Sequence, residues 1–392
     1  MLRVVIAPDS FKGSLSAPQV CVALARGLAR VWPDVIAVAR PMADGGEGTL
    51  DAVLAALGGN DLRSTRTVTG ASGAPVVAAY GIITRPEGAT AIIEIAQIIG
   101  ITDQFGMTTD VGNRSTLGVG ELVKALLDDG IRRFMVGLGG SSTNDAGAGM
   151  LTALGVSLRD AQGDSIVPTP VGLASLARVD ASALDARILR SDIKIMTDVN
   201  NPLCGDQGAT AIFGPQKGVA DDDQRRFDTA LAHFAQLAEA ALKPQAPCRA
   251  ADAPGAGAAG GLGFGLHLLG GTFLGGADMV ADAIKLDAAL SEADWAITGE
   301  GKSDRQTLLR KAPLVVAQRA RAHGVRATLI SGSVDACALP ALSEHFAGCF
   351  ALADGPMTLA ECLARTAELL ADRSEQAARV WDAAGGGRQH VA

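Results

Sequence analysis

The sequence predicts an α/β protein in which a flavodoxin-like, doubly wound parallel sheet is interrupted by a second, mixed α/β domain. Three observations lead to this fold class. Apolar strands alternate with amphipathic helices towards both ends of the chain, strand-like segments joined by short turns lie between them, and glycine-rich acidic loops follow several strands. Strand–helix alternation is typical of a covered parallel sheet, whereas short turns between strands predict antiparallel pairing.

Two strand–helix units are predicted at the N-terminal end. An apolar strand at 3–7 precedes a polar loop and a helix whose start is marked by Ser16 and Gln19, the spacing of a capping box. A second strand at 35–39 leads through the loop 43–48 into another helix with apolar residues at helical spacing.

The same alternation resumes near residue 290. Strands are predicted at 295–298, 327–330 and 349–352, and Thr358 with Glu361 marks the capping box of the last helix. Together with the two early strands, these three would form one parallel sheet.

The middle of the chain follows a different pattern. Strand-like segments at 65–69, 76–83 and 90–95 are separated by short turns, which predicts an antiparallel meander. Further strands are predicted at 134–138 and 193–196, with helices and a glycine-rich loop around them.

The change of pattern predicts the domain boundaries. Residues 1–60 and 286–385 are expected to form the discontinuous flavodoxin-like domain, and 61–285 the inserted mixed α/β domain. Because the candidate loops are divided between the two domains, the active site is expected in the cleft between them.

Composition excludes several classes of partner. Of 392 residues, 48% are hydrophobic and 19% charged, and the net charge of −8 argues against a nucleic-acid or membrane-surface binder. The uncharged stretch 253–277 contains ten glycines and His267, so a glycine-rich loop with a buried helix is predicted there rather than a membrane span. The apolar run at the N-terminus is too short for an export signal, and the six cysteines form no CxxC pair. A cytoplasmic protein is expected.

Loops rich in glycine and acidic residues follow four predicted strands, at 8–14, 43–48, 137–145 and 298–304. Ligands of open α/β sheets bind beyond the carboxyl ends of the strands. Glycines there allow backbone N–H groups to approach phosphate oxygens. Any one loop could be a plain tight turn, but four together favour a binding site.

Two phosphate-binding patterns are only near matches. The segment 255–260 reads GAGAAG, which fits GxGxxG, but no strand precedes it as a dinucleotide site requires. The segment 296–303 reads AITGEGKS and resembles a P-loop, yet Ala296 replaces the first glycine and Glu300 would repel a phosphate. Neither is interpreted as a nucleotide fingerprint, and Ala296 is expected to be buried in a strand.

Asp198 follows the strand at 193–196 in the sequence MTDVNNP. An acid and two amides at this point could order a turn through side chain–backbone bonds. They could also hold Mg²⁺ and a substrate hydroxyl. The spacing alone favours the turn.

Taken together and in order, the loops resemble the bacterial type-1 glycerate kinases over residues 2–380. The resemblance rests on IAPDSFKGSL (6–15), ADGGEGT (43–49), GGSSTND (139–145), DVNNP (198–202), IFGPQKG (212–218), PGAGAAGG (254–261) and ITGEG (297–301). It implies ATP-dependent phosphorylation of D-glycerate with Mg²⁺. There are two departures, since Arg310 stands where the family has glycine and Val119 where a threonine is common.

The resemblance and the chemistry of phosphoryl transfer suggest candidate residues for each role. The candidate catalytic residues are Asp198, Asp44 and Lys12. The candidate substrate-binding residues are Asp9, Ser10, Arg114, Asn200 and Asn201. The candidate nucleotide- or phosphate-binding residues are Gly139, Gly140, Ser141, Ser142, Thr143, Asn144, Lys217, Gly299 and Gly301. The candidate metal ligands are Asp198, Glu300 and Asp304.

A sensor that binds hydroxy acids without turnover is the alternative to a kinase. The presence of Asp9, Asp44, Asp145, Asp198 and Glu300 favours the enzyme. Phosphorylation of the 2-hydroxyl is favoured over the 3-hydroxyl by family analogy, and the sequence does not predict the oligomeric state.

Overall fold

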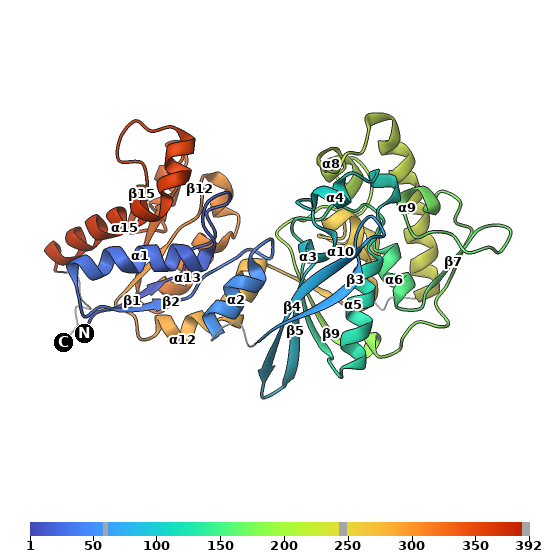
Figure 1. Ribbon diagram of the computed structural model, residues 1–392, viewed down its shortest axis with the longest axis horizontal. Coiled ribbons are helices and arrows are strands. Elements are labelled where there is room, and N and C mark those ends of the chain that lie inside the picture. The colour runs from blue at the N-terminus through green and yellow to red at the C-terminus, as the bar shows by residue number, and fades with distance from the viewer. Residues whose placement is uncertain (58–61, 243–248, 386–392) are drawn as a thin grey trace. The chain divides into compact units, whose positions relative to one another are not determined.

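The structure is a computed structural model that describes residues 1–57, 62–242 and 249–385 (Figure 1). The chain divides into two compact units. Unit 1 comprises Met1–Asp44, Gly48–Asp61 and Gly275–Ala392, and unit 2 comprises Gly45–Glu47 and Leu62–Leu274. The predicted junction at 60/61 falls outside the described residues. The later junction lies before helix α11 (Gly276–Ala283) instead of at residue 286, so this helix belongs to unit 1.

Unit 1 is built on a parallel sheet with the strand order β15-β13-β11-β1-β2. In order along the chain this is 2-1-3-4-5, the flavodoxin-like order, and the predicted fold class is confirmed. Val5 pairs with Ala296 although the two lie far apart in sequence. The strands are β1 (Arg3–Ile6), β2 (Ile36–Ala39), β11 (Trp295–Thr298), β13 (Arg326–Ser331) and β15 (Gly348–Ala351).

The central strands of this sheet are buried on both faces, whereas edge strand β2 alternates between half-buried and exposed residues. Helices cover the sheet, as apolar strands without alternation require. They are α1 (Ala17–Val31), α2 (Thr49–Leu57), α11, α12 (Leu286–Leu290), α13 (Ala312–Ala322), α14 (Leu339–Leu342) and α15 (Leu359–Ala383). A short parallel pair, β12 (Lys302–Ser303) with β14 (Ser333–Val334), lies beyond β11 and β13.

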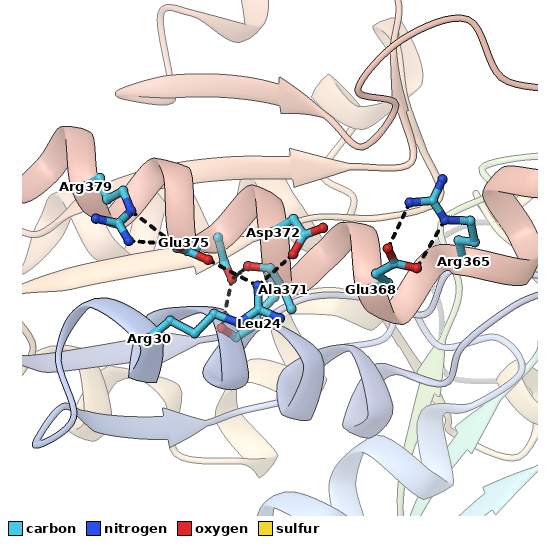
Figure 2. A network of polar contacts seen from close by, with 9 residues as sticks. Leu24, Arg30, Arg365, Glu368, Ala371, Asp372, Glu375 and Arg379 are labelled. Carbon is cyan, nitrogen blue, oxygen red and sulfur yellow. Dashed lines mark hydrogen bonds and ion pairs between the residues drawn. The ribbon is translucent and has the colours of Figure 1, made fainter.

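Helices α1 and α15 lie side by side although they come from opposite ends of the chain (Figure 1). A Cβ atom at Gly27 would lie 2.0 Å from the carbonyl oxygen of Ala371, so only glycine permits this contact. Figure 2 shows Arg30 of α1 reaching Asp372 and Glu375 of α15. These ion pairs are exposed and add little stability, so the buried close packing holds the two helices together.

Both predicted capping boxes of these helices are present. Ser16 N donates to Gln19 Oε1 at 2.9 Å at the start of α1. At the start of α15, Glu361 N donates to Thr358 Oγ1 at 3.2 Å and Thr358 N donates to Glu361 Oε2 at 2.8 Å. Each box satisfies backbone N–H groups that would otherwise lack an intrahelical partner.

Unit 2 contains a mixed sheet with the strand order β10-β9-β6-β5-β4-β3. The predicted antiparallel meander is confirmed in β3–β4–β5, and β5, β6, β9 and β10 run parallel. Strand β10, in the glycine-rich segment, was not predicted. The strands are β3 (Arg63–Thr69), β4 (Pro75–Arg85), β5 (Gly88–Glu94), β6 (Arg133–Gly137), β9 (Asp192–Met196) and β10 (Thr272–Leu274).

The helices of unit 2 include a short buried one, α10 (Leu262–Leu268), within the glycine-rich stretch as predicted. Among the described residues, no helix is both long enough and apolar enough to span a bilayer. The other helices are α3 (Ala96–Ile99), α4 (Gln104–Met107), α5 (Leu117–Asp128), α6 (Ala148–Ala153), α7 (Pro170–Leu173), α8 (Ala209–Phe213) and α9 (Asp221–Leu242). A hairpin pairs β7 (Ser157–Arg159) with β8 (Arg178–Asp180).

The two sequence departures have different structural settings. Val119 is fully buried in α5, where an apolar side chain fits the core. Arg310 has a φ of 61°, in the left-handed region that favours glycine, and its guanidinium pairs with Asp278. The glycine expected at residue 310 would therefore adopt this backbone conformation without strain.

We expect Arg310→Gly to be more stable than Arg310→Ala by about 1 kcal/mol, because both lose the ion pair but only alanine keeps the strained φ. Urea unfolding of the two variants beside the wild type measures the difference. Equal stabilities would show that the backbone at residue 310 is not strained.

Candidate active site

Acidic residues of unit 1 follow three neighbouring strands of the parallel sheet. Asp9 follows β1, Asp44 follows β2, and Glu300 follows β11. The loops after β1 and β11 are in direct contact, since Asp9 N donates to the carbonyl oxygen of Gly299 at 2.8 Å. Strand β1 is where the strand order reverses, and ligands of open α/β sheets bind at this switch point.

The pKa of the Asp9 carboxyl is strongly raised. Its side chain is only 8% exposed, and burial, followed by the negative charges of Asp44 and Glu300, raises its pKa to about 7. A 2.6 Å hydrogen bond from Ser10 N and the positive charge of Lys12 act in the opposite direction. The carboxyl of Asp9 therefore lies close enough to those of Asp44 and Glu300 to be repelled by both, and a bound cation would relieve this repulsion.

Glu300 is held by buried hydroxyl groups that the sequence analysis did not identify. Its Oε1 accepts hydrogen bonds from Thr307 Oγ1 at 2.6 Å and from Ser303 Oγ at 3.0 Å. Ser303 Oγ also lies 2.8 Å from Ser331 Oγ. Burial raises the pKa of Glu300, while these hydrogen bonds and Lys311 lower it. These contacts orient the carboxylate.

Asp304 has a structural role in addition to the predicted metal role. It caps the short 3-10 helix Arg305–Leu308 by accepting a hydrogen bond from Gln306 N at 2.8 Å. Its other oxygen lies 3.5 Å from the ammonium of Lys302. One oxygen is thus committed to the cap.

The segment 296–303, which resembles a P-loop in sequence, folds as a strand followed by a tight turn. Ala296 is fully buried in β11, as predicted, between Val5 and Ala327. A Cβ at Gly299 would lie 1.7 Å from the carbonyl oxygen of Ile330, so glycine is required by packing alone. The glycine at 299 is therefore no evidence for a phosphate.

We expect Ala296→Gly to leave the dissociation constant of ATP within about twofold, because Ala296 lies inside the sheet and not in a cradle. Stability should fall by about 0.5–1 kcal/mol through the entropy of glycine. Equilibrium titration and urea unfolding measure the two effects. Tighter ATP binding would instead identify a true P-loop.

The described residues contain no group of three or more His, Cys, Asp or Glu side chains arranged to hold a metal ion. Mg²⁺ at a phosphoryl-transfer site takes one or two protein carboxylates besides waters and substrate phosphates. Asp9 and Glu300 are buried carboxylates in unit 1 that could contact such an ion.

In unit 2, the loop 139–145 follows β6 and contacts the segment Gly45–Glu47. A Cβ at Gly139 would lie 2.4 Å from Gly46 Cα, and Gly139 N donates to the carbonyl oxygen of Gly45 at 3.4 Å. Glycine at 139 therefore permits a close approach of two backbones. The predicted loop 43–48 is divided, with Asp44 in unit 1 and Gly45–Glu47 in unit 2.

Lys217 lies beside this loop. It ends the 3-10 helix Pro215–Lys217 and is 2% exposed. Its Nζ donates to Ser141 Oγ at 3.0 Å and to the carbonyl oxygen of Thr143 at 2.8 Å. Burial, assisted by the charge of Arg114, lowers the pKa of Lys217 to about 7, while Asp145 acts to raise it.

Arg114 is buried, and its guanidinium is largely engaged with the backbone. Nε donates to the carbonyl oxygen of Thr109, Nη1 to those of Ser142 and Lys217, and Nη2 to that of Met107. A guanidinium has five N–H groups, so one remains for a ligand. Arg114 therefore links the loop 139–145 to the Lys217 segment.

Asp145 anchors the end of the loop, a role that the sequence did not identify. It is fully buried and accepts hydrogen bonds from Thr116 N and Oγ1, both at 2.8 Å, and from Gly147 N and Gly149 N, both at 3.1 Å. Burial raises its pKa while these bonds lower it.

Asp198 and Asn200 are exposed in the turn after β9. Val199 N donates to Thr197 Oγ1 at 3.4 Å, and Asn201 Nδ2 to the carbonyl oxygen of Gln207 at 2.8 Å. Strands β9 and β6 are neighbours, so this turn and the loop 139–145 begin at the same edge of the sheet. Asn201 has a structural partner, and the side chain of Asp198 is exposed to solvent.

The chain is similar to known proteins over nearly its full length. The profile of the "Glycerate kinase family" matches residues 4–382. A glycerate kinase of Bacillus subtilis is 39% identical over 373 residues, which cover 94% of this chain and 95% of the relative. A glycerate 2-kinase of Escherichia coli is 40% identical over 334 residues, covering 85% and 86%. The crystal structure of an assigned glycerate kinase 2 from Salmonella typhimurium superposes with a TM-score of 0.84 at 38% identity, covering 98% of this chain and 99% of that one.

Proposed function

The chain belongs to the glycerate kinase family, and we propose on that premise that it transfers the γ-phosphoryl group of ATP to a hydroxyl of D-glycerate. The observation that carries the proposal is the match over residues 4–382, which includes every loop described above. We place the reaction in the cytoplasm, where ATP is available.

The acidic residues of unit 1 suit the metal and the substrate hydroxyls. Mg²⁺, when bound with ATP, would neutralise charge on the transferred phosphoryl group. Glu300, oriented by Ser303 and Thr307, is the favoured protein ligand in this unit, with Asp9 beside it. Lys12 is exposed and supplies a cation for the substrate carboxylate or the transferred group.

In unit 2, Asp198 is the favoured general base. Its exposed carboxylate can accept the proton of the glycerate hydroxyl as the oxygen attacks the γ-phosphorus and the bond to ADP breaks. Asn200, exposed beside it, can orient the same substrate. A substitution in either set is expected to lower turnover.

We propose 2-phosphoglycerate as the product. A relative that bears the name glycerate 2-kinase, 40% identical to this chain, supports this choice. ³¹P NMR of the product formed from D-glycerate tests it, and a 3-phosphoglycerate resonance would reject the 2-hydroxyl.

A coupled assay of ADP release with D-glycerate tests the proposed activity. Turnover that depends on both glycerate and Mg²⁺ is expected. Glycerate binding in calorimetry without ADP release would favour the alternative, a hydroxy-acid sensor on the same fold.

A further inference from the structure

We infer that the phosphates of the nucleotide bind in unit 2, at Thr143 and Lys217, and not on the glycine-rich loops of the flavodoxin-like sheet in unit 1. The inference rests on the proposed function, because it assigns one of the two proposed substrates to a site. Three independent observations support it.

The first observation is the charge of the loops in unit 1. The carboxyls of Asp9 and Glu300 are 8% and 7% exposed at the strand ends where a phosphate would have to sit, and the charge of Asp44 acts on Asp9. Lys12 is the cation that opposes them at Asp9. Buried carboxylates repel an anion such as a di- or triphosphate, so these loops suit a cation and hydroxyl groups.

The second observation is a pair of buried cations in unit 2. Lys217 and Arg114 are 2% and 3% exposed, and within the described parts of the chain neither lies within 4.0 Å of a carboxylate. Buried charges are normally paired. Asp145 is the carboxylate that acts on Lys217, but it already accepts hydrogen bonds from Thr116, Gly147 and Gly149. Asp110 likewise acts on Arg114 without forming an ion pair, and it accepts a hydrogen bond from Gly112 N. Within the described residues, the two cations therefore have no directly paired carboxylate.

The third observation is an unsatisfied hydroxyl on the same loop. Thr143 is fully buried, and its Oγ1 has no hydrogen-bond partner within the described structure. The carbonyl oxygen of Thr143 accepts a hydrogen bond from Lys217 Nζ at 2.8 Å. The unsatisfied hydroxyl and the ammonium contact therefore belong to the same residue. Valine would fill the same volume without an unmet hydrogen bond. A phosphate oxygen could accept hydrogen bonds from this hydroxyl and from the remaining N–H of the Lys217 ammonium.

The test is the affinity of the full-length protein for ADP without added divalent cation, so that direct phosphate contacts dominate. Thr143→Val is expected to weaken ADP binding by about 10- to 100-fold, the usual range for a hydrogen bond to a charged group. Its melting temperature without ligand should be unchanged or higher, because the lost hydroxyl has no partner in the protein. Glu300→Gln, in unit 1, should change the ADP affinity by less than about threefold.

Thr210→Val is the matched control for Thr143→Val. Thr210 Oγ1 accepts a hydrogen bond from Asn144 Nδ2 at 3.0 Å, so removing it breaks a bond that exists. Its melting temperature should therefore fall by a few degrees. The two threonine variants thus distinguish a hydroxyl that binds a ligand from one that stabilises the fold.

Wild-type ADP affinity in Thr143→Val would overturn the inference and leave a buried water as the partner of the hydroxyl. A loss confined to D-glycerate binding would overturn it as well, by assigning the anion to the substrate carboxylate. So would a tenfold gain of ADP affinity in Glu300→Gln, because removing a charge that repels the phosphates can tighten binding that strongly only if they lie in unit 1. None of these titrations requires turnover, so the ADP-release assay with wild-type protein decides the proposed function separately.

Discussion

Asp198→Asn is expected to lower kcat by about 10²–10⁴ while the protein stays folded, the usual range for removing a general base. Asparagine keeps the size of the side chain and its ability to order a turn, but it cannot take the proton of the attacking hydroxyl. Because Asp198 is exposed, the unfolding free energy should change by no more than about 0.5 kcal/mol. Steady-state kinetics with saturating ATP and D-glycerate, beside circular dichroism, measure both.

Asp206→Asn is the matched control for this experiment. Asp206 is another exposed acid in the segment after β9, and its replacement removes the same charge. Its kcat should stay within about twofold of the wild type, as for a surface charge away from the chemistry. If folded Asp198→Asn also kept near-normal kcat, Asp198 would be a turn-forming residue and Asp44 the next candidate base.

The fold of unit 1 could be predicted because the sequence signals for its strands and helices are local and repeated. Apolar strands alternate with helices along the chain, and the capping boxes predicted at Ser16 and Thr358 are present. Parallel pairing then follows from the alternation of strand and helix, which is why Val5 and Ala296 could be expected in one sheet. Strand β10 was missed because three residues between glycines carry no periodic signal.

The candidate site was predictable in its residue types but not in its contacts. Strand ends and glycines identify the loops, and Lys217 does lie against the loop 139–145. Two of the four backbone acceptors of Arg114, those of Ser142 and Lys217, lie far from it in sequence, so no spacing rule could reveal them. The contact between Ser303 and Ser331 beside Glu300 was missed for the same reason, since Ser331 comes from another strand. Ser303 and Thr307 are close to Glu300 in sequence, but their spacing does not predict that they bond its carboxylate.

The left-handed conformation of Arg310 illustrates a limit of a different kind. A single sequence shows an arginine in a loop and nothing of its backbone angle. Comparison with the family pattern, which has glycine there, was the signal available, and the φ of 61° gives its physical reason.

Asp9→Asn is expected to make the protein more stable above pH 7 and less active. Burial and the charges of Asp44 and Glu300 raise the pKa of Asp9 from 3.8 to about 7, so its ionised form is less favourable in the folded than in the unfolded chain. The folded state binds the extra proton between these values, and wild-type stability therefore falls as the pH rises from about 4 to about 7. Asparagine removes that penalty and can still accept the hydrogen bond from Ser10 N.

The gain in unfolding free energy from Asp9→Asn should therefore be close to zero near pH 4, grow up to pH 7 and stay constant above it, at about 1–3 kcal/mol. Urea unfolding at pH 4.5 and pH 8 measures it, with Asp34→Asn, an exposed acid of unit 1, as the control without a gain. At pH 8 the kcat/KM of Asp9→Asn should fall at least about tenfold. The reason is that the buried Asp9 carboxylate lowers stability and lies at a strand end, and both features are typical of a functional residue. A variant that is less stable at pH 8 would show that the Asp9 carboxylate holds the loop together, and unchanged kcat/KM would remove it from the site.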